Sequence, residues 1–503
     1  MTNDNQEEPL IVDDGVDDPG DASSTQNGAV IDGVDNHPPE ISRVKVFGFS
    51  LGHMFNDMCA SMWFTYLMIY LEKVLKMRSW RAGTLMLIGQ VTDGLATPLI
   101  GVISDSKLLP QAVTRFGHRI PWHFVGFILV AVSFPFVFNS CLLCTSETSE
   151  NWKLIYYTPL IMCFQIGWAS MQVNHLALIP SLAHHETCQR TLSTSRLAAS
   201  VLSNLAVFLV LFIRFTLDQG EDIGPSDLPT FRTLALFVVA VGSVLTILFY
   251  ILTREPAHNS DEETVDNVQI TTSSERLGVK EYFTMPRFFT IGVIYMLTRL
   301  YGNLSQVYFP LYITMTLNLH KKYLGILPMI SYIFCFAVYS FLSSKCVNQK
   351  ISRLSLLFAG SFVALIASVL LYFKLPFEAI YITAAVMGIA QSLLLSSAFA
   401  FCNFLIGSDK GSSAFIYGSM SFADKVLNGV AFQLIELWNP SCNPHAEHED
   451  CSVFYRSVMV FIPGACAAVL GLLGAVFLTA RIHVQIAYDN TDRSILLRGG
   501  RQV

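Results

Sequence analysis

The chain has 503 residues, of which 52% are hydrophobic and 14% charged, with a formal net charge of −6. A soluble protein of this size carries about a quarter charged residues, so the composition excludes a large soluble core. The apolar residues gather in runs of about 20, the length that crosses a hydrocarbon core of about 30 Å. No basic domain indicates a nucleic-acid partner. No nucleophile–base arrangement, phosphate loop or metal motif indicates an enzyme, a metal site or a cofactor.

The N-terminal segment, residues 1–43, is acidic and rich in Gly, Ser and Asp. Because it has almost no aromatic residues, it cannot bury enough apolar surface to fold, and we expect it to be disordered. It also lacks the basic and apolar regions of a cleavable signal peptide.

Apolar segments then follow in two groups of six. The first group, residues 44–253, has spans near 44–72, 82–104, 121–142, 153–180, 193–216 and 231–253. The second group, residues 288–480, has spans near 288–316, 323–345, 353–374, 377–405, 413–438 and 454–480. A polar linker, 254–287, separates the groups, and a polar, basic tail, 481–503, follows them. This layout predicts an all-α polytopic membrane protein with 12 transmembrane helices in two six-helix halves, the fold of the major facilitator superfamily.

The distribution of Lys and Arg predicts the orientation in the membrane. With both termini in the cytosol, the cytosolic segments carry more Lys and Arg than the opposite loops, as the positive-inside rule requires. The loop after the first span opposes this bias, because it holds Lys73, Lys76, Arg78 and Arg81. We therefore expect the termini, the linker and the tail to be cytosolic.

Two pairs of cysteines fall in loops on the opposite side. Cys141 and Cys144 lie between the third and fourth spans, and Cys442 and Cys451 between the last two. Disulfides persist outside the cytosol, so these residues are candidates for bridges. The sequence leaves their pairing open.

Polar side chains recur at helical spacing inside five of the spans, so each of these helices has one polar face. Charged residues inside a span are rare and usually face the bundle interior or a water-filled cavity. The stripes are His53, Asp57 and Ser61; Asp93 and Thr97; Gln165, Trp168, Gln172 and His175; Arg299, Asn303 and Gln306; and Tyr417, Ser421, Lys425 and Asn428. We expect the five faces to line a shared interior.

The intramembrane acids have a functional and a structural interpretation. A half-buried carboxylate beside a cation can bind a proton or a metal cation and release it when the cavity changes sides, as in a symporter. We expect Asp93 within reach of Lys425, either as such a site or as a purely structural pair. The same alternatives hold for Arg299, His53 and His175. Asp424 points about 100° away from Lys425 around the helix, which favours packing or gating.

The segment DGLATPLIGVISDS…RFGHRIPW, residues 93–122, resembles the second helix and following loop of the glycoside–pentoside–hexuronide cation symporters. These symporters are a group of the major facilitator superfamily, and the resemblance covers residues 44–480. It places the group's sugar-contacting acid on Asp57, its fifth-helix arginine on Arg196 and its eleventh-helix lysine on Lys425. The residues that match the motif are Asp93, Pro98, Gly101, Asp105, Gly117, Arg119, Pro121 and Trp122.

Two residues depart from the pattern of that group. The second acid of its second helix is Thr97 here, which weakens a sodium site, because a hard cation needs several oxygen ligands. The fourth-helix acid that helps to grip sugar is Gln172 here. The remaining acid suits a proton, or no coupling at all. Both departures argue against the alternative function, a cation-coupled symporter of a sugar or other small organic solute.

Five longer segments resemble a second group in the same superfamily, one that imports cysteine into lysosomes and melanosomes. The resemblance implies cysteine transport from cytosol to lumen by alternating access, with the proton as the candidate coupling ion. The segments are GHMFNDMCASMWFTYL, GQVTDGLATPLIG, QIGWASMQVNHLALIP, YMLTRLYGNLSQVY and SAFIYGSMSFADKVLNGVA.

Cysteine has a carboxylate, an ammonium group and a thiol, which need a cation, an acid and a small, partly apolar pocket. The candidates are Lys425, Arg299 or Arg196 for the carboxylate, Asp57 or Asp93 for the ammonium group, and the surroundings of Trp168 and Tyr417 for the thiol. The candidate set also includes Asn56, Thr97, Gln172, His175 and Asn303.

The loop GVISDSKLLPQAVTRFGHR after the second span is the candidate cytosolic gate. We expect Asp105 to accept hydrogen bonds from Arg115, Arg119 or a helix N-terminus of the facing half.

The tail carries a candidate sorting signal. Asp492, followed after three residues by Leu496 and Leu497, matches the acidic dileucine pattern that cytosolic clathrin adaptors read. It predicts adaptor binding and a location in the lysosome membrane. Together with the apolar spans and the resemblance, this implies a multi-pass protein of the lysosome or melanosome membrane whose partners are the lipid bilayer, cysteine, protons and adaptors. The alternative outside transport is a non-transporting membrane scaffold. A scaffold, however, does not need charged residues inside the membrane.

Overall fold

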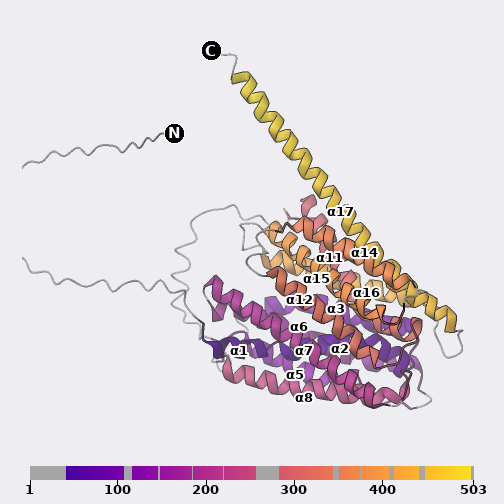
Figure 1. Cartoon of the computed structure of the whole chain (residues 1–503). Coiled ribbons are helices and arrows are strands. Elements are labelled where there is room, and N and C mark those ends of the chain that lie inside the picture. The colour runs from indigo at the N-terminus through magenta and orange to yellow at the C-terminus, as the bar shows by residue number, and fades with distance from the viewer. Residues whose placement is uncertain are drawn as a thin grey trace, which may run out of the picture. The chain divides into compact units, whose positions relative to one another are not determined.

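The fold is described from a computed structural model of the chain (Figure 1). The chain divides into two units, Met1–Pro39 and Glu40–Val503. All residues that the structure describes belong to the second unit, and every regular element among them is helical. The described ranges are 41–106, 116–145, 148–183, 185–218, 220–255, 282–343, 351–373, 376–406, 413–440 and 448–499.

Twelve spans are present in the described ranges, six in each half, at the places that the sequence predicts. The first half contains α1 (Arg43–Leu51), α2 (Met54–Ile69) with the π-helical turn η1 (Tyr70–Val74), α3 (Ser79–Asp105), α5 (Ile120–Val137), α6 (Glu150–Leu182), α7 (Glu186–Leu217), the short turn η2 (Pro225–Asp227) and α8 (Leu228–Leu252). The second half contains α11 (Pro286–Leu311) with the π-helical turn η3 (Tyr312–Thr316), α12 (Tyr323–Ser343), α14 (Arg353–Tyr372), α15 (Ala379–Ile406), α16 (Ser413–Trp438) and α17 (His448–Gly499).

Eight of the helices in the described ranges are long and apolar enough to cross a membrane by length and composition alone. The other four spans are α1 with α2, α6, α11 and α16. These four carry four of the five polar stripes. In the first of them, α1 and α2 are each too short to cross a membrane alone; the lower hydropathy of α6, α11 and α16 follows from the polar side chains that they turn toward the interior, where a charged residue is tolerated.

The first span lies where the sequence predicts it, but its helix is interrupted once. It breaks at Gly52, where α1 ends and α2 begins two residues later. Gly52 is required there, because a Cβ atom would lie 2.7 Å from ring atoms of both His175 and Phe249.

Two buried histidines satisfy carbonyl groups at this break. The ring of His175 donates from Nε2 to the carbonyl oxygen of Phe49 at 2.8 Å, and the ring of His123 donates from Nε2 to that of Gly52 at 3.2 Å. A buried backbone carbonyl needs such a donor when a helix is interrupted. This bond gives His175 a structural contact, and its candidate role toward the solute stays a prediction. His123 is a partner that the sequence did not indicate.

Small residues allow the closest helix contacts. A Cβ atom at Gly126 in α5 would lie 2.6 Å from the carbonyl oxygen of Gly167 in α6, so both positions need glycine for these two helices to pack. Between the halves, α3 packs along α16 and α12 along α7.

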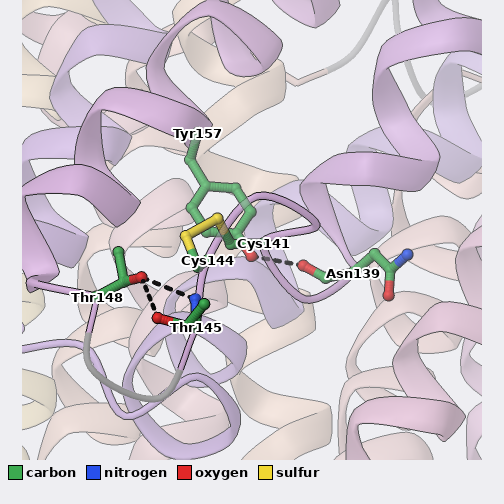
Figure 2. The surroundings of a disulfide bond; sticks show 6 residues. All are labelled: Asn139, Cys141, Cys144, Thr145, Thr148 and Tyr157. Carbon is green, nitrogen blue, oxygen red and sulfur yellow. Dashed lines mark hydrogen bonds between the residues drawn. A yellow bond between two sulfur atoms is a disulfide. The ribbon is translucent and has the colours of Figure 1, made fainter.

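The loop between α5 and α6 contains a disulfide between Cys141 and Cys144 (Figure 2). The hydroxyl of Tyr157 donates to the carbonyl oxygen of Asn139 at 2.5 Å beside it. Cys451 is disulfide-bonded as well, whereas Cys442 lies outside the described ranges. The expectation of a bridge in the loop between α5 and α6 is confirmed.

Candidate functional site

The two halves meet at an ion pair in the middle of α3 and α16. Lys425 Nζ lies 2.7 Å from Asp93 Oδ1 and donates to Thr97 Oγ1 at 2.8 Å. The Thr97 hydroxyl accepts from Lys425 and in turn donates to the carbonyl oxygen of Asp93 at 2.8 Å. The side chains of Asp93 and Lys425 are only 3% and 11% exposed. The expected contact between them is confirmed, and Thr97 is its third member.

A second pair lies within the C-terminal half. Arg299 Nε on α11 donates to Asp424 Oδ2 on α16 at 3.1 Å, and the Asp424 side chain is 2% exposed. The expectation that Asp424 serves packing or gating stays a prediction, and the pair with Arg299 joins α16 to α11, while α16 also packs against α3. The turn of about 100° between adjacent residues sends Lys425 toward α3 and Asp424 toward α11. Both therefore contribute a charge to the interior.

A third cluster lies in the N-terminal half. His53 Nδ1 lies 2.8 Å from Asp57 Oδ2, and Arg196 Nη2 lies 3.3 Å from His53 Nε2. Because a guanidinium group can only donate, His53 accepts at Nε2 and donates from Nδ1 to Asp57. The imidazole is thus held as a neutral link between Arg196 and Asp57.

These three clusters balance in charge. Each contributes one cation and one carboxylate, and the histidine between the partners of the third is neutral. A solute without net charge can exchange partners with such pairs and leave no buried charge unpaired, whereas an ion could not.

The remaining candidates lie around these clusters. Asn56 is 1% exposed, and its amide nitrogen and oxygen have no hydrogen-bond partner among the described residues. Asn303 is 6% exposed, one turn beyond Arg299 on α11. Gln172 on α6 is partly buried.

Trp168 and Tyr417 have different ring partners. Trp168 stacks on Phe164, with ring centroids 5.8 Å apart, whereas Tyr417 contacts Phe399 and donates its hydroxyl to Asn403 Oδ1 at 2.7 Å. A thiol pocket that involves both residues stays a prediction.

The gate region follows the expected pattern in part. Arg119 forms an ion pair with Asp105 at the end of α3 and donates from Nη1 to Ser104 Oγ at 2.8 Å. Arg115 lies outside the described ranges. For Asp492, Leu496 and Leu497 of the sorting motif, the structure describes the helical backbone of α17 and not the side chains.

Glu255 at the end of the first half explains the glycine of the gate motif. Its Oε2 accepts the backbone N–H groups of Arg119 at 2.8 Å and Ile120 at 3.2 Å, which caps the positive N-terminus of α5. Gly117 has a φ of 99°, and a Cβ atom there would lie 2.1 Å from the Glu255 carboxylate. Only glycine allows both the turn and the close approach.

At the end of the bundle opposite the gate, a latch joins the halves. Lys321, in the loop before α12, lies 2.8 Å from Asp218 Oδ2 and 2.7 Å from Asp227 Oδ1 in the loop between α7 and α8. Nearby, the Tyr66 hydroxyl donates to the carbonyl oxygen of Leu324 at 2.9 Å. The halves are therefore held together on this side.

Replacing Lys321 with Met should destabilise this latch, because Asp227 is fully buried and loss of one partner of a buried pair costs about 3–5 kcal/mol. The adjacent Lys322→Met is the matched control. Faster hydrogen exchange in the loops at 218–228 and 317–324 of the Lys321 variant alone would agree. Equal exchange in the two variants would contradict the latch.

The latch should persist over a wide pH range. The hydrogen bond from Lys321 lowers the pKa of Asp218. Burial of Lys321 disfavours its charge, but its bonds to Asp218 and Asp227 outweigh burial and raise its pKa. The Asp218 contribution is lost only as pH falls through the lowered value, and the Lys321 contribution only as pH rises through the raised one.

Comparison with known proteins identifies the family. The family described as “MFS/sugar transport protein” matches residues 48–435. The chain belongs to the major facilitator superfamily. It is therefore a membrane transporter, and the twelve spans in the described ranges agree with a multi-pass protein.

Two relatives in the superfamily are similar to almost the whole chain. Major facilitator superfamily domain-containing protein 12 from Equus caballus is 40% identical over 453 residues, which is 86% of this chain and 93% of the relative. The protein of the same name from Homo sapiens is 38% identical over 452 residues, again 86% and 93%. The resemblance to a particular group within the superfamily is thus confirmed.

Solved structures of the superfamily share the fold at low identity. A bacterial homologue of the human lysosomal transporter Spinster, in an inward-facing and unoccupied conformation, has a TM-score of 0.62 and 14% identity, and covers 88% of this chain and 99% of that one. The xylose transporter XylE from E. coli, in an inward-open conformation, has a TM-score of 0.57 and 13% identity, and covers 84% and 94%.

Proposed function

We propose that this transporter imports cysteine from the cytosol into lysosomes or melanosomes by alternating access, with the proton as the coupling ion. The resemblance to a group that includes a cysteine importer supports the choice of substrate. The observation that carries the transport role is the bond of Lys425 to both Asp93 and Thr97 across the two halves.

The charge balance of the site supports a zwitterion. The cysteine carboxylate would replace a carboxylate partner at Lys425, Arg299 or Arg196, and its ammonium group would replace a cation at Asp93 or Asp57. Because each exchange keeps opposite charges together, the solute can enter without leaving a buried ion unpaired. A sugar offers no charge for either exchange.

Proton coupling would use the same pair. When the carboxylate of cysteine engages Lys425 and its ammonium group engages Asp57, the lysine no longer compensates Asp93 fully. A proton on Asp93 then restores the balance, because a carboxylate that loses its cation in a low-dielectric site takes up a proton more readily. Thr97 supplies one hydroxyl and no charge, which gives Na⁺ a poor ligand set.

The experiment is uptake of labelled cysteine into vesicles from cells that express the protein, with and without an imposed pH gradient. We expect excess unlabelled cysteine to reduce uptake of the label, and we expect xylose to leave it unchanged. A response to the gradient supports the proton, and an equal rate without it contradicts coupling. Absence of competable cysteine uptake, or competition by the sugar, contradicts the proposed substrate.

The location in the cell depends on the tail in this proposal. We expect Leu496→Ala with Leu497→Ala to move the protein to the plasma membrane, because adaptors would no longer read the dileucine pattern. Surface labelling with a membrane-impermeant reagent measures the change, with Leu472→Ala, an exposed apolar residue of α17, as the control. Unchanged lysosomal staining of the double variant would show that the dileucine pattern is not the sorting signal.

A further inference from the structure

Two buried carboxylic acids from opposite halves meet at the end of the bundle away from the gate. Glu72, on η1 of the first half, is 6% exposed, and Glu436, on α16 of the second half, is 1% exposed. Asn439 and Tyr455 connect the two side chains through hydrogen bonds. They belong neither to the three ion pairs nor to the latch at Lys321.

A chain of hydrogen bonds surrounds the pair. The Tyr455 hydroxyl on α17 donates to Glu72 Oε2 at 2.7 Å. The Asn439 amide, just after α16, donates to Glu436 Oε2 at 2.9 Å and lies 3.0 Å from the Tyr455 hydroxyl. One oxygen of each acid is thus satisfied by a neutral donor.

The other oxygen of each acid lacks a hydrogen-bond donor. Glu72 Oε1 and Glu436 Oε1 are buried and receive no N–H or O–H donor from the described residues. Two ionised carboxylates are both acceptors and cannot hydrogen-bond to each other, whereas a proton between them would supply the missing donor. Two like charges in so buried a site also repel each other strongly, and one proton between the acids would relieve that repulsion.

The groups that face the pair agree with one proton. From η1, the adjacent Lys73 is buried as well. From α11, the Tyr308 ring lies beside the Tyr455 ring, with centroids 6.5 Å apart. From α3 the neighbour is Gly83, which brings no charge. One ammonium group, two acids and one shared proton make the cluster neutral.

We propose that Glu72 and Glu436 bind one proton between them, and that this proton holds the two halves together on this side of the membrane. Separation of the halves hydrates both carboxyl groups, and hydrated carboxylic acids are ionised at neutral pH. The closed state thus binds one more proton than the open state. By linkage, acid on this side favours closure and alkali favours opening.

This inference concerns the gate and holds whatever solute is carried. It is also separate from coupling at Asp93, which lies in the middle of α3. In the orientation predicted from the sequence, the pair faces the lumen, so an acidic organelle would slow opening toward its own interior.

Hydrogen exchange of the full-length protein in lipid nanodiscs tests the proposal without any substrate. The readout is the protection of residues 70–77 and 450–458, corrected for the intrinsic pH dependence of exchange, between about pH 5 and about pH 8. We expect wild-type protection to fall over this range by up to about tenfold per pH unit, the limit for release of one proton. Protection that does not change with pH would overturn the proposal.

Glu436→Gln should keep the protection high at both pH values, because the amide donates an N–H where the shared proton stood. Glu72→Gln should behave alike and serves if the first variant does not fold. Glu150→Gln is the control, since Glu150 lies on the same side but pairs with Arg81 at 2.6 Å; its protection should vary with pH as in the wild type. The proposal is overturned if Glu436→Gln and Glu72→Gln leave the pH dependence intact, or if the control removes it.

Discussion

Uptake of labelled cysteine should fall to background when Lys425 is replaced by Ala. The change removes the only cation within ion-pair distance of Asp93 among the described residues and leaves a carboxylate that is 3% exposed. Removal of one partner of a buried pair costs about 3–5 kcal/mol. This cost destabilises the conformations in which α3 packs against α16. Asp93→Asn should have the same effect on uptake, because the amide can neither be ionised nor carry a proton.

Two controls separate the site from general damage. Lys45→Ala removes a cation from the exposed face of α1 and should leave uptake unchanged. Lys425→Arg keeps the charge, and it should retain the protein in its compartment even if transport slows. Normal cysteine uptake in Lys425→Ala or in Asp93→Asn, measured at equal protein abundance, would contradict the roles given to this pair.

Replacing Arg299 with Met should lower the thermal unfolding temperature, since Asp424 would be left buried and unpaired. The expected loss is again about 3–5 kcal/mol. Changing Asp424 to Leu in addition should restore most of the stability, because an apolar pair of similar volume needs no counter-ion. Thermal unfolding of the purified variants in detergent measures both steps.

Transport by the double variant decides what the second pair does. If Arg299 and Asp424 serve the solute, the variant with both changes should be stable and inactive. Recovery of both stability and cysteine uptake would mean that the pair only joins α11 to α16. A single Arg299→Met variant with wild-type unfolding temperature would contradict the buried pair itself.

The helical spans and the central ion pair were predictable from the sequence. Runs of about 20 apolar residues are a strong signal of a membrane span. A charged side chain inside such a run usually faces the bundle interior. Asp93 and Lys425 were therefore predictable partners. The break at Gly52 was not predictable in the same way, because its cause is the approach of His175 and Phe249 from other helices.

The missed residues share one reason. The helical angle between Asp424 and Lys425 is known from the sequence, but the position of α11 beside α16 is not. His123 lies in an otherwise apolar stretch of α5 and belongs to none of the polar stripes. Glu255 lies at the edge of a polar linker, and Glu72 and Glu436 lie near the ends of spans, where acids are ordinarily hydrated. Their partners come from distant parts of the chain, which sequence periodicity does not reveal.

The most direct test of the central claim is counterflow of labelled cysteine in liposomes that contain only the purified protein. Liposomes preloaded with unlabelled cysteine should take up the label, and those with Lys425→Ala should not. Label uptake no greater than in protein-free liposomes, from a wild-type protein that is folded by thermal unfolding, would contradict cysteine transport by this chain.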